Sequence, residues 1–374
     1  MNIIQVLDRE FKIVGVLDDY ISLIWTPRYD EMGEFELELP IKYLGGELVK
    51  IDYALKIPDL EGFMIIEDMH PTRDSEGNAR LKLNGSSGSK LLKSRVFLED
   101  FFAEGWAYWS IAKLMNDNII LPDNPRRRID GFNVIATDVI NQVEFEEWYQ
   151  PNNVYEVVKA ICQRCNYGFR VDIMADRNLK LHIYEGLDRS FNQSERPYVM
   201  FSQEFDNLLN EDYSVKTSDE HNLVYVHTGV PNDDGGNPEL SLLQLYLGED
   251  EPHGRYRKEF VYNAPDLNLH DLTPGELVDI VGTRGGDALR DAKPEVIFDA
   301  TSVPNVSFKF GEDFYLGDLV QCVIFGQHIT ARIVEFARTI DEHGRNDFVT
   351  FKMDDGDVSW RLPPPTFNSE SEGV

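Results

Sequence analysis

The chain has 374 residues, 42% of them hydrophobic, which predicts a folded protein of two to four domains at about 100 to 200 residues each. Its 66 Asp and Glu outweigh 36 Lys and Arg, and the formal net charge of −30 disfavours nucleic-acid binding, which draws on cations to replace phosphate counterions. Three cysteines cannot build a disulfide framework, and the sequence shows neither a signal peptide nor a run of roughly 18 to 20 apolar residues, so we predict synthesis in the cytoplasm without export or stable membrane insertion.

Short apolar strands separated by turn residues fill the first 98 residues. The expected strands cover residues 3–6, 11–16, 21–25 and 35–39. A hairpin follows, in which residues 64–67 and 79–83 flank a D-x-x-G turn from Asp74 to Gly77. This pattern predicts a compact, tube-like β-domain over residues 1–98.

Helical periodicity enters between residues 99 and 200. Residues 106–115 suit an amphipathic helix, and Asn153 suits the N-cap of a second helix over 154–166. Two strands are expected after it, at 169–173 and 179–184. The segment 99–200 is therefore predicted to be an α+β accessory domain.

Four aromatic residues in this domain could stack on sugar rings. They are Trp106, Trp109, Trp148 and Tyr149. The helical spacing of the first two favours packing in the domain core instead, and core packing is our prediction for the group.

Cys162 and Cys165 form a C-x-x-C pair, which can be a redox centre or half of a zinc site. Both fall on the apolar stripe of the predicted helix 154–166, and the sequence has no second C-x-x-C. We therefore predict buried core thiols, and Cys322, within a strand, receives the same interpretation. The eight histidines show no metal-binding spacing, so we predict no metal, no cofactor and no catalytic residue.

The remaining sequence is typical of a second β-domain interrupted by an insertion. Strands are expected at 223–226 and again after residue 318, and a turn-rich tip, a strand and a helix over 274–283 lie between them. Loops beyond about 15 residues are uncommon, so this interruption is predicted to be a domain. The predicted parts are 201–230 with 301–356 as the second tube-like β-domain, 231–300 as the inserted domain and 357–374 as a flexible acidic tail.

Two segments more than two hundred residues apart share one pattern. Residues 52–85 and 318–356 each contain an apolar strand, a strand ending in Glu, a D-x-x-G turn and a strand that leaves through glycine. The two turns run from Asp74 to Gly77 and from Asp341 to Gly344. A chance match stays open, because such hairpins occur in every β-rich protein. The register is also ambiguous, since residues 43–49 match 315–320 as well. A true repeat predicts one chain that supplies two similar positions in a ring.

Motifs over most of the chain resemble one known family in their order and spacing. They are Asp19-Tyr20 through Trp25 with residues 33–37, residues 66–68 and 126–129, Asp188-Arg189-Ser190 with residues 201–207, residues 222–226, and Tyr315 through Gly317-Asp318 to Val320. The family is that of the siphophage tail-tip hub proteins of the ReqiPepy-type Gp37-like group, related in fold to myophage baseplate hubs and to the N-terminal part of tail-associated lysins. The resemblance implies a mainly β fold with α+β parts, in which two similar tube-type β-barrel domains accompany two smaller inserted or accessory domains.

The resemblance also implies a structural, non-enzymatic role at the tip of a long non-contractile tail. Three chains would present six similar barrels and would adapt a sixfold tail tube and distal-tail ring to a threefold tip. During genome ejection DNA would pass without specific binding, and acidic walls would repel its phosphates. An ordinary acidic surface that keeps the protein soluble is the alternative explanation of the charge.

The partners implied by the resemblance are two further copies of the chain, the distal tail protein, the tape-measure protein and the receptor-binding or fibre proteins of host attachment. The implied location is the tail tip of the virion, after synthesis in the host cytoplasm. Two other functions stay open. A cell-wall-degrading enzyme would use carboxylates, although no pair stands out among 66 acidic residues. A glycan-binding adhesin would use the aromatic residues from Trp106 to Trp109 or the pair Trp148 and Tyr149.

Overall fold

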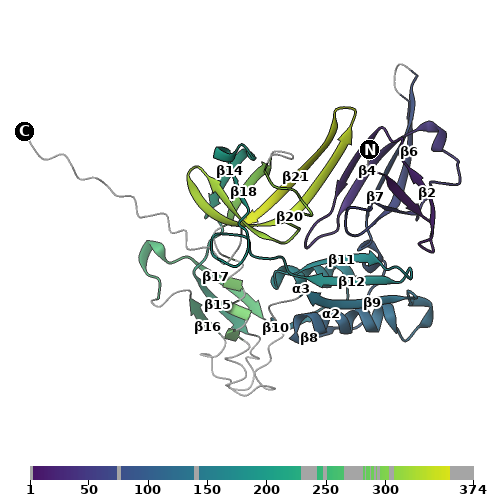
Figure 1. Cartoon of the computed structure of the whole chain (residues 1–374). Helices are drawn as coiled ribbons and strands as arrows, with labels where there is room; N and C mark the ends of the chain where they lie inside the picture. The colour runs from purple at the N-terminus through teal and green to yellow at the C-terminus, as the bar shows by residue number, and fades with distance from the viewer. Residues whose placement is uncertain are drawn as a thin grey trace, which may run out of the picture. The chain divides into compact units, whose positions relative to one another are not determined.

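The computed structural model describes residues 3–73, 77–138, 143–228, 242–246, 251–264, 281–282, 284–286, 288–289, 292, 295–302 and 307–353. They are mostly β-strands arranged in several sheets, as predicted (Figure 1). The chain divides into a large unit, Met1–Glu211 with Asp299–Val374, and a small unit, Asp212–Phe298. Within the described ranges, no helix is long and apolar enough to cross a membrane.

One 13-stranded sheet has the strand order β14-β18-β21-β20-β3-β4-β7-β6-β5-β1-β2, with β19 paired to β20 and β13 paired to β19. Its strands are β1 (Ile4–Leu7), β2 (Ile13–Leu17), β3 (Ser22–Thr26), β4 (Glu34–Pro40), β5 (Ala54–Lys56), β6 (Met64–Arg73), β7 (Ala79–Ser87), β13 (Met200–Ser202), β14 (Leu208–Lys216), β18 (Glu295–Ser302), β19 (Leu319–Ile324), β20 (Gln327–Asp341) and β21 (Gly344–Met353). Strand β4 shows the residue pattern that produces them. Phe35, Leu37 and Leu39 are buried and the glutamates between them are not, which is the period of two of a half-buried strand.

The segment 90–184 forms the α+β part of the large unit. Its elements are α1 (Lys90–Lys93), β8 (Phe101–Trp106), α2 (Ala107–Met115), β9 (Phe132–Asp138), β10 (Glu144–Tyr149), α3 (Val154–Arg164), β11 (Gly168–Ile173) and β12 (Leu179–Tyr184). Strands β8 and β10 pair antiparallel, and β12 pairs antiparallel with β11 and parallel with β9. The Asn153 side chain accepts a hydrogen bond from the Glu156 N–H at 3.0 Å, so the predicted N-cap of α3 is confirmed.

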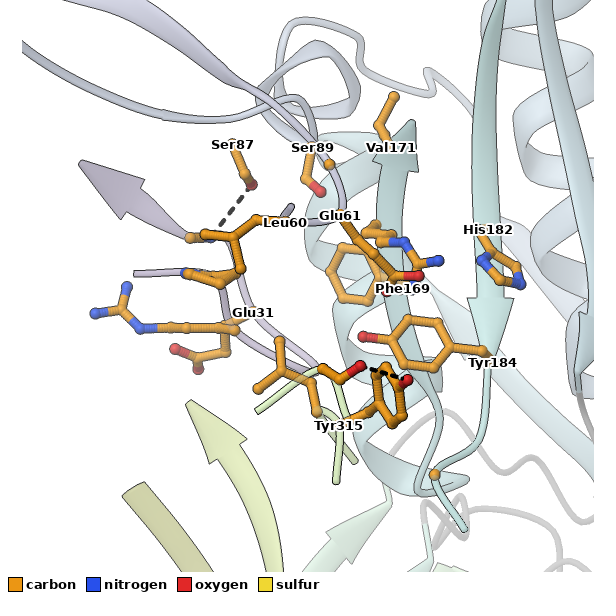
Figure 2. Close-up of a pocket in the computed structure, with 18 of the residues that line it drawn as sticks. Glu31, Leu60, Glu61, Ser87, Ser89, Phe169, Val171, His182, Tyr184 and Tyr315 are labelled. Carbon is orange, nitrogen blue, oxygen red and sulfur yellow. Dashed lines mark hydrogen bonds and ion pairs between the residues drawn. The ribbon is translucent and has the colours of Figure 1, made fainter. Parts of the chain in front are cut away.

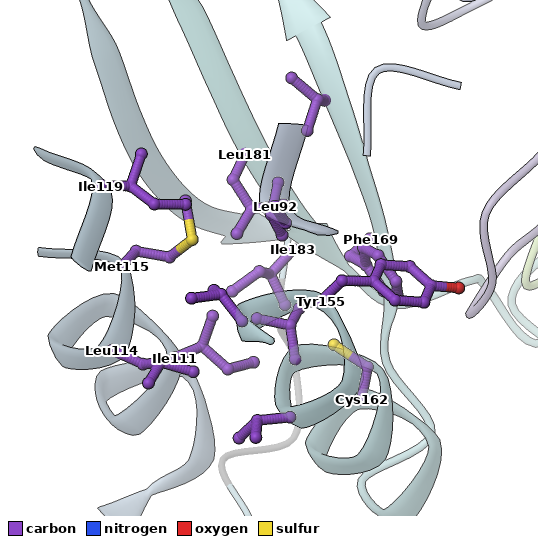
Figure 3. Close-up of a cluster of buried hydrophobic side chains, with 14 of the residues drawn as sticks. Leu92, Ile111, Leu114, Met115, Ile119, Tyr155, Cys162, Phe169, Leu181 and Ile183 are labelled. Carbon is purple, nitrogen blue, oxygen red and sulfur yellow. The ribbon is translucent and has the colours of Figure 1, made fainter. Parts of the chain in front are cut away.

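The core of this part lies between helices α2 and α3 and strands β11 and β12 (Figure 3). Cys162 and Cys165 are buried there, and Cys322 is buried in β19, which confirms the interpretation as core thiols. Burial raises the pKa of Cys162, and it raises the pKa of Cys165 to about 11, so both remain neutral thiols at pH 7.

The prediction that the aromatic group packs in this core is wrong for two members. Trp109 is 59% exposed and Trp148 is 60% exposed. Helix α2 buries a stripe that includes Ile111 and Leu114, and Trp109 falls outside it. In β10, successive side chains alternate, so Tyr149 packs against the core while Trp148 faces solvent.

The two segments that share a sequence pattern form equivalent meanders. Strands β5, β6 and β7 pair in sequence, and so do β19, β20 and β21. Each long hairpin has one bulge near its base, at Glu67 in β6 and at Val334 in β20. The next strands continue the match, because β7-β4-β3 corresponds to β21-β18-β14 in the sheet order. We call β3 to β7 the first repeat and β14, β18 and β19 to β21 the second repeat.

The competing alignment of residues 43–49 with 315–320 matches a turn but not a strand. Residues 44–45 and 316–317 both form turns, and β19 begins at Leu319, whereas no strand begins within 43–49. The counterpart of β19 in the first repeat is β5, the strand that precedes the long hairpin in each case.

The small unit begins at Asp212, earlier than residue 231, where we predicted the insertion to begin. Strand β15 (Leu223–Thr228) was assigned to the second β-domain, but it is the central strand of a separate sheet in the small unit. Its partners are β16 (Leu242–Tyr246) and β17 (Glu259–Ala264). Val224 and Val226 are buried in the small core of this unit, which suits its central strand.

Several predicted features lie outside the described residues. They are Asp74, the turn-rich tip at 231–238, most of the helix over 274–283 and the tail at 357–374.

Candidate functional site

Five of the residues that carry the family resemblance lie together beside strand β19. They are Asp188, Arg189, Ser190, Gly317 and Asp318. Backbone hydrogen bonds join the two segments, from the Leu319 N–H to the Leu187 carbonyl at 3.0 Å and from the Arg189 N–H to the Leu319 carbonyl at 2.8 Å. The segment 187–190, which follows the α+β part, is thus hydrogen-bonded to the start of β19.

Asp318 is the centre of this cluster. Its carboxylate is almost fully buried and accepts hydrogen bonds from the Leu187 N–H at 2.7 Å, the Arg189 Nε at 2.7 Å and the Tyr315 N–H at 3.0 Å. Burial raises the pKa of Asp318, and the Arg189 guanidinium and the backbone donors act against that rise. A buried carboxylate with this many donors holds its neighbours in one arrangement.

Two glycines allow close packing in this cluster. A Cβ at Gly186 would lie 1.9 Å from the Gly317 carbonyl carbon, and a Cβ at Gly317 would lie 2.2 Å from the Tyr29 ring. Gly317 also has φ +89°, a conformation that other residues seldom adopt.

Tyr29 joins three parts of the large unit. Its N–H donates to the Val334 carbonyl in β20 at 2.8 Å, and its carbonyl accepts from the Phe169 N–H in β11 at 2.9 Å. Its buried hydroxyl donates to the Asn166 carbonyl at 2.8 Å. The residue follows β3, so the backbone and side chain of this one residue link the first repeat, the α+β part and the second repeat.

The remaining family-motif residues lie elsewhere, in the first repeat or beside it. Asp19 accepts a hydrogen bond from the Tyr43 hydroxyl and pairs with Lys42, and the lysine together with the tyrosine lowers the pKa of Asp19. Tyr20 and Trp25 are buried, and the Trp25 ring lies 5.9 Å from that of Phe35. The structure therefore brings together only the 188–190 and 317–318 subset of the predicted residues.

The two glycines of the predicted repeat turns are both described, and both have a positive φ. Gly77 has φ +91° and Gly344 has φ +122°. Asp341 pairs with Gly344 across the two-residue turn, and its side chain accepts a hydrogen bond from the His343 N–H at 2.8 Å.

Sequence reasoning missed Arg338, the largest buried charged side chain in the described part of the protein. It is 1% exposed in β20, and it donates to Asp347 at 3.0 and 3.1 Å and to Asp59 at 2.8 Å. Asp59 belongs to the loop between β5 and β6, 279 positions away in the sequence. An arginine in an alternating strand carries no local signal of such a distant partner.

An open cavity of about 610 Å³ lies where the first repeat, the α+β part and the start of β19 meet (Figure 2). Arg170 lies on its wall, where it pairs with Glu61 at 2.9 Å and with Asp172 at 3.1 Å and lies over the Tyr184 ring at 4.8 Å. The charge of Arg170 is thus balanced by carboxylates of the same chain. Within the described ranges, no group of three or more His, Cys, Asp or Glu is placed to hold a metal ion.

This architecture is shared with known phage tail proteins. A family model described as Siphovirus ReqiPepy6 Gp37-like protein matches residues 3–351. Prophage tail protein gp18 from Listeria monocytogenes EGD-e has a TM-score of 0.54 at 11% identity, with 95% of each chain covered. A tail protein from Neisseria meningitidis MC58 has a TM-score of 0.57 at 12% identity, over 95% of this chain and 98% of that one. The 43 kDa tail protein of prophage MuSo2 from Shewanella oneidensis has a TM-score of 0.56 at 14% identity, over 94% and 98%. At these identities the structures show a shared fold, and the comparison with curated proteins finds no match.

Proposed function

The chain belongs to the family of Siphovirus ReqiPepy6 Gp37-like proteins, and we propose that it is the structural hub at the tip of a long non-contractile phage tail. Three copies form a ring in which six similar repeats surround one axis. The ring adapts a sixfold tail tube and distal-tail ring to a threefold tip, and it carries no enzymatic activity.

One observation carries this proposal: the two repeats have the same strand order, each with a bulge near the base of its long hairpin. A chain with two equivalent units in one continuous sheet supplies two equivalent positions to a ring. Three such chains supply six, which matches the symmetry of a sixfold partner on one side and leaves a threefold face on the other.

The charge of the chain is consistent with passage of DNA through this ring. A formal net charge of −30 gives a surface that repels phosphate rather than retaining it. The proposed partners are the distal tail protein, the tape-measure protein and the receptor-binding or fibre proteins, and the proposed location is the virion.

Light scattering on the purified chain tests the ring. The expected mass is 129 kDa, three times the 43.0 kDa of one chain, for the chain alone, or 129 kDa plus the mass of the bound partner after mixing with the distal tail protein. A mass of 43.0 kDa in both conditions would contradict the proposal.

The proposed lack of enzymatic activity is tested separately by a zymogram on host cell walls. We expect no cleared zone, with a known cell-wall hydrolase as the positive control. Lysis by the purified chain would favour the cell-wall-degrading alternative.

The exposed tryptophans favour one second candidate function, binding of a glycan. Trp148 stacks on Phe102 with ring centroids 4.6 Å apart, and Trp109 contacts Tyr108 at 5.4 Å. Such rings offer flat apolar faces to a sugar. A glycan array tests this function: loss of a signal in Trp109→Ala or Trp148→Ala, with Leu121→Ala as an exposed apolar control, would support it.

A further inference from the structure

The two repeats differ in the strand pairing of their long hairpin beyond the bulge. In the second repeat, β20 beyond its bulge pairs with β21 on one edge and with β3 on the other, through Arg338, Thr339 and Ile340. This pairing joins the second repeat to the first within one chain. Arg28 reinforces it, since its Nε donates to Glu335 at 2.6 Å.

The equivalent part of the first repeat has one edge without a strand partner among the described residues. We call residues 68–73 of β6, which follow the bulge, the arm. The arm pairs with β7, whereas β5 pairs only with Met64 and Ile65. Counted in rungs from the bulge, Arg338 to Ile340 correspond to Pro71, Thr72 and Arg73, all of which are exposed.

The counterpart of β3 in the second repeat is β14, and it lies at one end of the sheet. Strand β3 has a partner on both edges, but in the described part of the sheet β14 pairs only with β18. Leu208 of β14 is buried, while the next residue, Leu209, is 51% exposed. Among the described residues, each chain therefore has one strand edge without a partner in each repeat: the edge of the arm in the first and the edge of β14 in the second.

We infer that the arm of one copy pairs antiparallel with the β14 edge of the next copy, reproducing between chains the β20–β3 pairing seen within the chain. The inference rests on the proposed ring and names its strand-level contact. Because the two surfaces lie on different parts of one chain, the contact is head-to-tail, and three such contacts alternate with three internal ones to close a ring. The occupant is thus a second copy of this chain.

The composition of the arm favours a specific partner over general strand pairing. Pro71 has no N–H, and His70 and Arg73 are polar and exposed, features that protect a free strand edge from aggregation. Strand β2, at the other end of the sheet, exposes Ile13, Val14 and Val16. Strand β2 is not part of the strand order that the repeats share, so no pairing within the chain shows which strand would pair with it.

Disulfide trapping tests the pairing. Residues opposite each other on paired strands have Cβ atoms about 4.5 to 5.5 Å apart, which is close to what a disulfide spans. Thr72→Cys and Arg73→Cys are each combined with Leu209→Cys, so that both faces of the arm are sampled. The native thiols are buried and give the background in the parent chain. Mild oxidation of the trimer should shift the band on a non-reducing gel from 43.0 kDa to 129 kDa in at least one double variant.

The matched control is Ile13→Cys with Leu209→Cys, which places an equally exposed thiol on β2. Cross-linking of this pair, with none from Thr72 or Arg73, would overturn the inference and leave the trimer standing. A chain that stays monomeric in every condition would overturn both the inference and the proposed function. Hydrogen exchange on the unmodified chain gives a second measurement, because those amides of 68–73 that do not bond to β7 should be protected in the trimer and should exchange freely in the dissociated chain.

Discussion

The two repeats share a strand order but are stabilised by different side chains. The first repeat has an apolar core, in which Leu37, Leu39, Leu81 and Leu83 are fully buried. The second repeat adds buried polar residues to its apolar core, among them Asp318, Gln321, Thr330 and Arg338. Its strands come from distant parts of the chain, so polar groups with defined partners hold segments that local sequence does not bring together. One topology can therefore be kept in place either by continuous apolar strands or by buried charged pairs.

The largest expected effect comes from Asp318→Ala in the second repeat. The change leaves the Arg189 guanidinium without its carboxylate and two backbone N–H groups without an acceptor, so we expect the free energy of unfolding to fall by about 3 to 5 kcal/mol. Urea denaturation measures it. Asp318→Asn keeps the shape and part of the hydrogen bonding and should lose less. Equal stability of Asp318→Ala and the parent would remove the proposed role of the cluster.

Gly186→Ala tests the close backbone contact at the same place. The new Cβ would lie 1.9 Å from Gly317, so one backbone must move, and we expect a loss of about 3 kcal/mol. Gly45→Ala is the control, because its φ of +76° strains the backbone while nothing lies within 4 Å. That strain costs about 1 to 2 kcal/mol. A larger loss at Gly45 than at Gly186 would contradict the contact.

Asp347→Asn weakens the partner of the buried Arg338, and its effect depends on pH. We expect a loss of about 2 kcal/mol at pH 7. Burial alone would raise the pKa of Asp347, but its hydrogen bonds with Arg345 and Arg338 hold that pKa below its usual value. A lowered pKa stabilises the fold above the unfolded-state value of about 3.9, and that contribution is lost as pH falls through the folded value. Urea unfolding of parent and variant should thus show a constant difference from pH 7 to 5 and a shrinking one below about pH 4. A difference that grows below pH 4 would contradict this assignment.

The smallest effect is expected beside the first repeat, from Asp19→Asn. Asp19 is partly exposed and pairs with Lys42 on the surface, so the loss should stay below about 1 kcal/mol. Salt should reduce the difference further, because exposed charge pairs are screened. A loss as large as that of Asp318→Ala would erase the contrast between the repeats.

Much of the local structure could be predicted from the sequence. The strand pattern of the hairpins, the turn from Asp341 to Gly344, the N-cap at Asn153 and the buried Cys162 all depend on residues that lie close together in the sequence. The exposed Trp109 and Trp148 were mistaken for core residues, because periodicity marks which residues share a face and leaves open which face is covered.

The sequence by itself determined the mainly β architecture, the repeated hairpins and the family. The tertiary structure alone decided which segments meet: Arg189 with Asp318 across 129 positions, Arg338 with Asp59 across 279, and β20 with β3. The physical reason is the sequence distance over which each interaction acts. Turn chemistry and side-chain alternation act over a few residues and leave their mark in the local sequence, whereas a buried ion pair or a joined sheet edge depends on how the whole chain folds back on itself.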